Sequence, residues 1–296
     1  MEKVLNKEKE MQKYILKNPK SFNLDHIFEC GQCFRWNKQE DGSYTGIFKE
    51  NVLNVKKEGN DFIFKGMCKG NIQDVIEKYF DLSRDYEKIK NELSQIDKSM
   101  EVSIEYGEGI RILNQDLWET IISFIISANN NIPRIKGIIE RLATKYGKEI
   151  IFEGKSYYTF PTPEQLKDVT VQDYRKLGLG FRDVRLYETV HMVLEGRVNL
   201  KEMHNNADTL EVREQLLSLS GVGPKVADCI LLFSTLKRLE VFPIDVWVRR
   251  VMNELYIKNL DENKVNKKEI ERIANEKFGN LAGIAQQYLF YWKREA

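Results

Sequence analysis

The sequence has no run of 18 apolar residues, few cysteines and prolines, and almost no net charge. Because a membrane-spanning helix needs about 20 apolar residues, we expect no membrane span. Residues 1–18 are charged throughout and lack the apolar core of a secretory signal, so we expect a solvated helix or arm there. With so few cysteines, we expect a reducing, cytoplasmic location, associated with the nucleoid if the source is bacterial.

The 46 basic and 45 acidic residues leave a net charge of +1, so any attraction for nucleic acid has to come from a local patch. Four cysteines lie at positions 30, 33, 68 and 229. Cys30 and Cys33 form a C-x-x-C pair, which is typical of a redox pair or of half a zinc site. Neither Cys68 nor Cys229 supplies a second pair, and we therefore expect no metal, no iron–sulfur cluster and no other cofactor.

The 296 residues are enough for two packed domains. From 23 to 69, short strand-like runs alternate with turn signals about every eight to twelve residues, which predicts an antiparallel meander. The turn signals are Asp41-Gly42, Glu58-Gly59-Asn60 and Lys65-Gly66. From 113 onward helical periodicity dominates. We therefore predict an α+β fold, with a small N-terminal antiparallel sheet domain over 1–110 and a larger all-helical domain over 111–296.

Apolar periodicity and boundary residues predict a series of helices. They cover 72–80, 85–96, 118–126, 133–146, 163–168, 208–219, 225–236, 246–256 and 281–292. A further helix should end at Gly178-Leu-Gly180. The helices 208–219 and 225–236 flank a glycine turn, and this arrangement predicts a helix–hairpin–helix.

The most informative motif is that turn, which reads LSGVGPKVADC over 219–229. Gly221 and Gly223 allow a tight turn whose backbone N–H groups can approach an anion closely. The turn opens a helix whose free N–H groups and positive dipole end favour a phosphate. Lys225 begins that helix, and Asp245 follows about twenty residues later. A phosphate clamp beside an amine and a carboxylate indicates chemistry on a nucleic acid.

Lys225 lies on an apolar helix and shares a face with Cys229 at i+4. Desolvation and the positive helix end disfavour an ammonium, so they favour the free amine that a Schiff-base lysine needs. A solvent-exposed lysine is the alternative. Asp245 precedes an apolar helix, where it would act as a helix cap and could also stabilise positive charge on a sugar ring. The sequence does not separate these two roles.

Three more features could contact DNA. The asparagines 129–131 form a polar run between two buried helices, and their amides could fill the space left by a flipped nucleotide, although asparagine is also common in turns. Arg134 and Arg182 each follow a loop and could bind a base edge, although an isolated arginine is more often a surface residue. Gln286 and Phe290, at i and i+4, could read and stack on a base, with core packing as the alternative.

Six segments, in order along the chain, resemble the 8-oxoguanine DNA glycosylases of the helix–hairpin–helix GPD superfamily. They are GQCFRW (31–36), SANNNIPRI (127–135), LGLGFR (177–182), LSGVGPKVADC (219–229), FPID (242–245) and AGIAQQYLF (282–290). The resemblance implies a base-excision-repair enzyme that flips 8-oxoguanine out of duplex DNA. It would cleave the N-glycosidic bond through a lysine Schiff base and nick the abasic strand by β-elimination.

The resemblance also implies how the damaged base would be held. Gly31 would offer its carbonyl to the N7–H that 8-oxoguanine has and guanine lacks. Cys229 and Phe290 would sandwich the base, Gln286 would read its Watson–Crick edge, and the Pro243 carbonyl would line the pocket.

For catalysis, the resemblance implies that Lys225 attacks C1′ and that Asp245 supports departure of the base. Gly221 and Gly223 would present backbone N–H groups to a phosphate.

Further contacts to the duplex are implied as well. Asn129 would fill the gap in the duplex, Phe181 would wedge the stack, and Arg134 and Arg182 would hold the orphaned cytosine. The partner would be double-stranded DNA with 8-oxoguanine opposite cytosine, and we expect a monomer. Two positions depart from the family pattern. Trp247 replaces a polar residue, often histidine, that lies near a phosphate, and Phe181 replaces the usual tyrosine.

Two other functions remain open at this stage. A monofunctional alkyl-base glycosylase would share the fold, but that class usually lacks the lysine at the turn. A non-catalytic helix–hairpin–helix DNA-binding protein needs the glycine turn, but it does not need Lys225, Asp245, Gln286 and Phe290 together.

Overall fold

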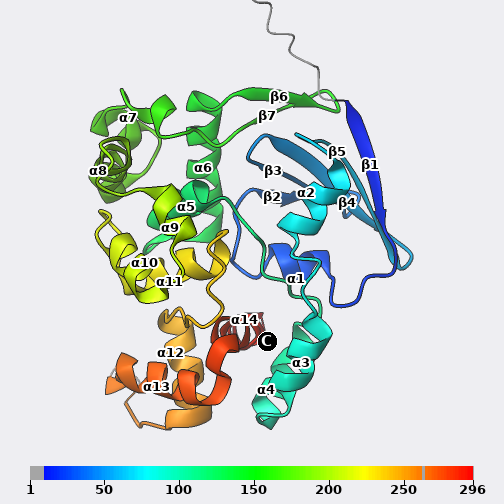
Figure 1. The fold of residues 1–296 in the computed structure, drawn as a ribbon, viewed down its shortest axis with the longest axis vertical. Coiled ribbons are helices and arrows are strands. Elements are labelled where there is room, and N and C mark those ends of the chain that lie inside the picture. Colours follow the sequence, from blue (N-terminus) through cyan, green and yellow to red (C-terminus); the bar gives the residue numbers. More distant parts are fainter. Residues whose placement is uncertain (1–9, 262–263, 296) are drawn as a thin grey trace, which may run out of the picture.

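The computed structural model describes residues 10–261 and 264–295. Its N-terminal part is a five-stranded antiparallel sheet in the order β1-β5-β4-β3-β2, and helices lie beside it (Figure 1). The strands are β1 (Met11–Leu16), β2 (Trp36–Lys38), β3 (Tyr44–Phe48), β4 (Asn51–Glu58) and β5 (Asp61–Met67). The predicted α+β architecture and the predicted meander are confirmed.

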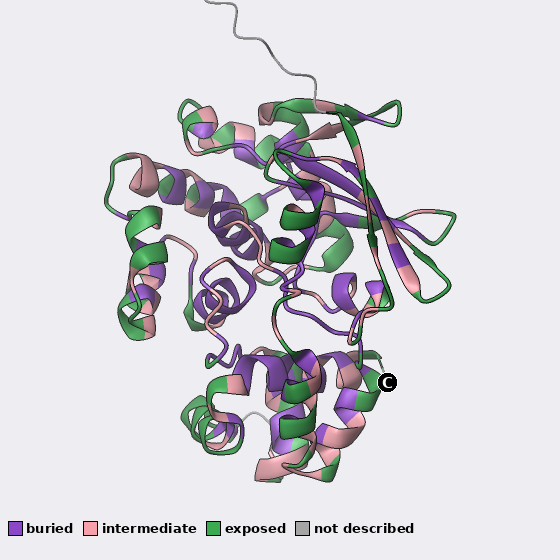
Figure 2. Cartoon of the chain, turned by 45° about the vertical axis from the view of Figure 1, so that its right-hand side comes forward, coloured by how far each residue is buried: buried purple, intermediate pink, exposed green. Residues whose placement is uncertain are grey.

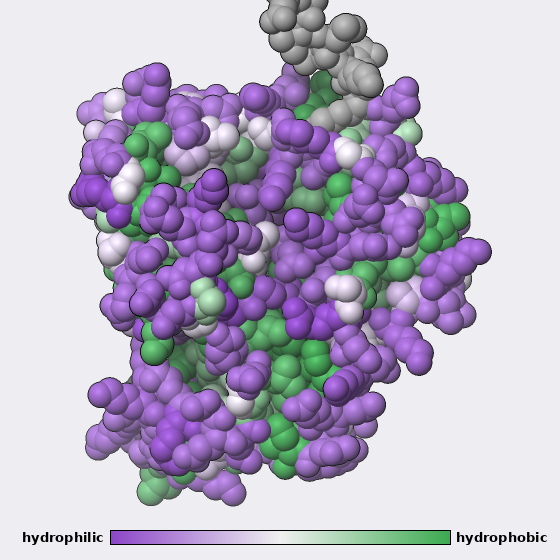
Figure 3. All heavy atoms as spheres, in the orientation of Figure 1, coloured by the Kyte–Doolittle hydropathy of each residue, from purple (hydrophilic) through white to green (hydrophobic). Residues whose placement is uncertain are grey.

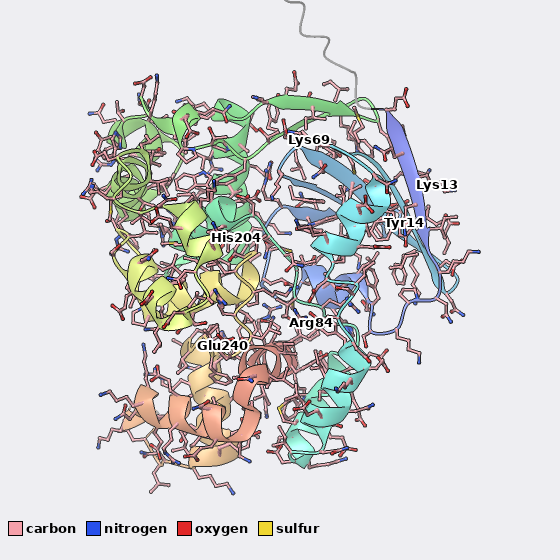
Figure 4. All side chains as sticks on the ribbon, in the orientation of Figure 1. Lys13, Tyr14, Lys69, Arg84, His204 and Glu240 are labelled. Carbon is pink, nitrogen blue, oxygen red and sulfur yellow. The ribbon has the colours of Figure 1, made fainter. Side chains whose placement is uncertain are left out.

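Strand β1 corrects the expectation of a solvated helix or arm for part of the N-terminal segment; residues 1–9 lie outside the described residues. β1 pairs antiparallel with β5, with Tyr14 opposite Phe64. Lys13 is exposed and points away from the sheet, whereas Tyr14 is half-buried and points toward it (Figure 4). The free main-chain groups of the β5 edge need a partner, and this pairing outweighs the charged composition of the segment.

The prediction of a turn at Lys65-Gly66 is wrong, because both residues lie inside β5. A Cβ at Gly66 would lie 2.3 Å from the carbonyl oxygen of Val52 on β4. Glycine is needed here because two backbones approach closely. The other two turn signals are confirmed, and Gly42 and Gly59 both have a positive φ, of 79° and 61°.

The helices predicted from periodicity are present, with shifted ends. The α-helices are α1 (Leu24–Phe28), α2 (Ile72–Tyr79), α3 (Tyr86–Ser94), α4 (Lys98–Tyr106), α5 (Leu117–Ser127), α6 (Ile132–Tyr146), α7 (Val171–Lys176), α8 (Asp183–Leu194), α9 (Leu200–Asn205), α10 (Thr209–Leu217), α11 (Pro224–Phe233), α12 (Val246–Met252), α13 (Lys267–Phe278) and α14 (Ala282–Glu295). Short 3-10 helices are η1 (Glu164–Leu166), η2 (Gly180–Arg182) and η5 (Gly279–Leu281). After α12 the chain continues as a π-helix, η3 (Asn253–Ile257).

The second part of the chain is mostly helical, but the prediction that it is all-helical is wrong, because it contains a β-hairpin. The strands β6 (Glu149–Phe152) and β7 (Lys155–Tyr158) pair antiparallel. Glu153 and Gly154 join them with φ values of 47° and 75°, as a two-residue hairpin turn requires. Phe152 packs against Ile47 and Val52 of the N-terminal sheet, so the hairpin connects the two parts of the molecule.

The larger hydrophobic core lies among the helices, where α5 is buried along most of its length (Figure 2). This core also takes residues from α3 and α4, among them Tyr86, Leu93 and Met100. Helix α4 packs against α14, and α3 packs against α4, although both helices precede residue 110. The domain boundary at 110 stays a prediction. On the face shown in Figure 3 most side chains are hydrophilic, and hydrophobic ones gather near α14 and α3.

Candidate active site

The glycine turn between α10 and α11 has the predicted geometry. Gly221 has a φ of +84°, and a Cβ there would lie 2.8 Å from Cδ of Arg185. Gly223 is the N-cap of α11, and no side chain caps the helix. A Cβ at Gly223 would meet nothing within 4 Å. The N-terminal end of α11 is therefore open, and its first N–H groups can bind an anion.

Lys225 and Asp245 line the same cleft, whose volume is about 700 Å³. Asn129, Trp247 and Arg249 also line it. Asp245 is the N-cap of α12, and its Oδ1 accepts a 2.8 Å hydrogen bond from the backbone N–H of Val248. The structure therefore brings the predicted amine and carboxylate together, and it fixes the carboxylate by capping.

The predicted desolvation of Lys225 is confirmed, but the neighbours of Lys225 outweigh it in the unbound protein. Burial lowers the pKa of the Lys225 ammonium, but Cys229 and Asp245 raise it, and the net pKa lies above the ordinary lysine value. Burial raises the pKa of the Cys229 thiol to about 11. At neutral pH the thiol is therefore uncharged, and Asp245 is the anion in the same cleft whose charge favours the ammonium.

The ring of Phe124 adds to this effect, because Nζ of Lys225 lies 5.4 Å from the ring centre. Lys225 thus rests as a cation beside a carboxylate. It has to lose a proton before it can attack carbon.

The three asparagines of the loop after α5 have different roles. Asn131 caps α6, and its Oδ1 accepts a 3.0 Å hydrogen bond from the N–H of Arg134. Nδ2 of Asn130 donates to the carbonyl oxygen of Ile126 at 3.1 Å. Asn129 is exposed and has a φ of +53°. Of the three side chains, only that of Asn129 makes no hydrogen bond within the described part of the chain, so it is the one available to enter DNA.

The guanidinium of Arg182 is already occupied in the unbound protein and is not free to bind a base. Arg182 is buried, and its guanidinium donates to the carbonyl oxygens of Ala128, Asn129 and Leu179. It therefore holds the Asn129 loop in the unbound protein. Arg134 is exposed, and its Nη2 donates to the carbonyl oxygen of Gly178 at 3.3 Å.

Phe181 is exposed, with 56% of its surface accessible, as a wedge residue requires. Cζ of Arg182 lies 4.2 Å from its ring centre, and Cζ of Arg185 lies 5.1 Å from it. Arg185 also covers Gly221, so it connects the wedge with the glycine turn. Sequence reasoning missed Arg185, because only the fold brings these two motifs together.

Among the residues predicted to bind the base, the structure brings Gly31 and Phe290 together. Gly31 has a φ of +84°, and a Cβ there would lie 3.5 Å from the ring of Phe290. Gln286 on α14 is buried, and its Oε1 has no hydrogen-bond partner. An unpaired buried amide oxygen is costly, which suggests that a ligand completes its hydrogen bonding. Cys229 and Pro243 are buried as well.

Two sequence signals receive an explanation from the structure. Cys30 and Cys33 are buried thiols, and burial raises the pKa of Cys30 to about 11, so neither resembles a reactive redox cysteine. Trp247 is exposed at the rim of the cleft, with Cζ of Arg250 5.5 Å from its ring.

Comparisons with known proteins agree with this geometry. The family model of the 8-oxoguanine DNA glycosylase N-terminal domain matches residues 14–121, and that of the HhH-GPD superfamily base excision DNA repair protein matches residues 122–279. A probable N-glycosylase/DNA lyase of Methanothermobacter thermautotrophicus is 32% identical over 76% of either chain. The N-glycosylase/DNA lyase of Saccharomyces cerevisiae is 31% identical over 92% of this chain and 84% of the yeast protein.

A solved structure is similar over nearly the whole chain. It is the Clostridium acetobutylicum 8-oxoguanine glycosylase/lyase in complex with double-stranded DNA containing cytosine opposite 8-oxoguanine. It superposes with a TM-score of 0.89 at 44% identity, covering 97% of this chain and 98% of that one. The chain therefore belongs to the HhH-GPD superfamily of base excision DNA repair proteins and carries the N-terminal domain of the 8-oxoguanine DNA glycosylases.

Proposed function

We propose that the protein excises 8-oxoguanine from duplex DNA and then cleaves the abasic strand, with Lys225 as the nucleophile. The observation that carries this proposal is the shared cleft of Lys225, Asp245 and Asn129 beside the open N-terminal end of α11. A phosphate bound at that helix end would place the sugar of an extruded nucleotide over the amine. The asparagine would then occupy the space that the nucleotide leaves in the duplex.

The chemistry proceeds in two steps. Lys225 loses a proton to solvent, and its amine attacks C1′ while the glycosidic bond breaks and the base leaves with the bonding electrons. The Asp245 carboxylate stabilises the positive charge that develops on the sugar ring. The nitrogen lone pair then expels O4′ from C1′, and O4′ takes up a proton. The protonated Schiff base that results makes the proton on C2′ acidic, and loss of that proton expels the 3′ phosphate by β-elimination.

Recognition of the base combines Gly31, Gln286 and Phe290. The Gly31 carbonyl accepts the N7–H of 8-oxoguanine and repels the N7 lone pair of guanine, and such a buried mismatch costs about 1–3 kcal/mol. The unpaired amide oxygen of Gln286 accepts from the Watson–Crick edge of the base. The Phe290 ring and the Cys229 thiol cover its two faces.

For the opposite base we propose cytosine. Arg134 is exposed, and its guanidinium lies close to η2, which carries Phe181 and Arg182. An arginine can donate two hydrogen bonds to one base edge, which supports a preference for an orphaned base rich in acceptors.

We further propose that the protein acts as a monomer in a reducing, cytoplasmic compartment, and the four buried thiols suit that location. No helix in residues 10–261 and 264–295 is long and apolar enough to cross a membrane.

The direct test is a base-release and strand-cleavage assay on a duplex with 8-oxoguanine opposite cytosine. The wild-type protein should release the base and nick the strand, and Lys225→Gln should do neither. Lys201→Gln, an exposed lysine on α9, is the matched control and should behave like the wild type. Base release without any nicking by the wild type would indicate a monofunctional glycosylase. Duplex binding without base release would indicate a non-catalytic DNA-binding protein.

A further inference from the structure

Helix α14 holds the turn that carries Gly31 through two side chains outside the predicted site. Nε2 of Gln287 donates a 2.6 Å hydrogen bond to the carbonyl oxygen of Cys30. Nη2 of Arg294 donates to the carbonyl oxygen of Glu29. The paired residues are 257 and 265 positions apart in the sequence. The carbonyls of two consecutive residues are thus occupied, whereas the Gly31 carbonyl, next along the chain, accepts no hydrogen bond from the described residues.

Arg294 also contacts Phe290, one of the residues proposed to face the base. Gln287, Phe290 and Arg294 are spaced i, i+3 and i+7, so they lie on one stripe of α14. Cζ of Arg294 lies 5.1 Å from the centre of the Phe290 ring. Its Nη1 lies 3.1 Å from the position that a Cβ of Gly31 would occupy. Arg294 therefore contacts the ring and the turn at once.

Resting on the proposed function, we propose that Gln287 and Arg294 are positioning residues for discrimination between 8-oxoguanine and guanine. They fix the Gly31 carbonyl relative to the Phe290 ring and the neighbouring Gln286. The two bases differ at N7 by the direction of a single hydrogen bond. A carbonyl can exploit this difference only if it is held within about 0.5 Å of the right place.

The two side chains are separate from the bond-breaking chemistry. Neither lines the cleft that contains Lys225 and Asp245. An abasic site has no base for the Gly31 carbonyl to read. The positioning role therefore predicts that loss of either side chain weakens excision of 8-oxoguanine and leaves strand cleavage at a preformed abasic site intact.

The test measures both activities under single-turnover conditions at saturating protein. Arg294→Met removes the hydrogen-bond donors but keeps the aliphatic stem, and Arg294→Lys keeps one charged donor. Gln287→Met keeps the side-chain length without the donor. Lys293→Met is the matched control, because Lys293 is the neighbour on α14 and pairs with Glu254 at 2.7 Å instead.

We expect Arg294→Met and Gln287→Met to slow 8-oxoguanine excision about tenfold or more, as for the loss of a buried hydrogen bond. Cleavage of the abasic duplex should change less than about twofold. Arg294→Lys should recover part of the excision rate, and Lys293→Met should match the wild type in both assays.

Parallel loss of the two activities, or unchanged excision in Arg294→Met, would overturn the inference. Gln287 is buried, so a thermal melt checks that its variant folds. Arg294 is only partly buried, which keeps the test decisive if the Gln287 variant does not fold. A wild-type protein that released no 8-oxoguanine would contradict the proposed function rather than this inference.

Discussion

Lys225 lies in the first turn of α11, and Lys237 lies in the segment that follows this helix. Both are largely enclosed by protein, yet their pKa values shift in opposite directions. The pKa of Lys225 is raised, because Cys229 and Asp245 outweigh the effect of burial. Burial lowers the pKa of Lys237 to about 8. Lys237 also has a carboxylate partner, with Nζ 3.4 Å from Oδ2 of Asp81.

The difference lies in the remaining neighbours. The Arg84 and Arg111 guanidiniums near Lys237 repel its charge, whereas Lys225 faces an aromatic ring and a neutral thiol. Lys237 also donates to the carbonyl oxygen of Ile112, so its amine is occupied. Burial alone therefore does not identify a nucleophile. A carboxylate partner does not identify one either, because Lys237 lines a cleft of about 600 Å³ together with Asp81. Lys225 differs in its place at the open N-terminal end of α11, in the cleft that Asn129 and Asp245 line.

The largest effect that would test this comparison is expected at Asp245. Asp245→Asn should keep the fold, because asparagine is also a good N-cap. It should slow base excision by about 10²–10³-fold, because a preorganised charge at the developing cation is lost. Single-turnover excision and a circular dichroism melt measure the two parts. Asp81→Asn, which removes the carboxylate beside Lys237, is the control and should leave the excision rate unchanged.

The pH dependence sharpens the comparison further. The pKa of Lys225 is raised, so the amine fraction should grow about tenfold per pH unit throughout the neutral range. We expect the single-turnover rate at pH 6–9 to rise with pH in the wild type. In Asp245→Asn the rise should level off at a lower pH, because the ammonium loses its anionic partner. A rate that is flat from pH 6 to 8 would show that proton loss from Lys225 does not limit the reaction.

A smaller effect concerns the loop beside the cleft. Arg182→Ala should narrow the preference for cytosine opposite the lesion several-fold, because Arg182 holds the loop of Asn129 through backbone carbonyls. It should also lower the melting temperature, since it leaves buried carbonyls unpaired. Arg134→Ala, at an exposed position, should change the preference without the loss of stability. Equal wild-type rates opposite all four bases would rule out the preference itself.

The smallest expected effect is the contribution of Lys237 to the pH dependence of the free energy of unfolding. The folded pKa of Lys237, about 8, lies below that of an unfolded lysine, so the unfolded state binds more protons between pH 8 and 10. Stability from this group therefore rises with pH across that window. Between pH 7.5 and 9.5, the free energy of unfolding should rise about 1–2 kcal/mol more in the wild type than in Lys237→Met. Urea unfolding at fixed pH values measures the difference, and parallel curves would contradict the assignment.

The sequence predicts those parts of the site whose signals are local. Glycines at a turn, a lysine at N2 of the following helix and an aspartate before an apolar helix each have a distinct pattern, and the structure confirms their placement. The sign of the Lys225 pKa shift could not be predicted, because Asp245 and Phe124 come close only in the fold. Gln287 lies inside a recognised segment, but its partner Cys30 is on another element. Strand β1 depends likewise on a free sheet edge that local composition does not reveal.

The most direct test of the central claim is to identify the lysine that forms the covalent intermediate. The wild-type protein is incubated with a duplex containing 8-oxoguanine opposite cytosine in the presence of borohydride, digested, and analysed by mass spectrometry. The account predicts that the adduct lies on the peptide that contains Lys225, that Lys225→Gln forms none, and that Lys237→Gln forms as much as the wild type. An adduct on Lys237 or on another amine would contradict it.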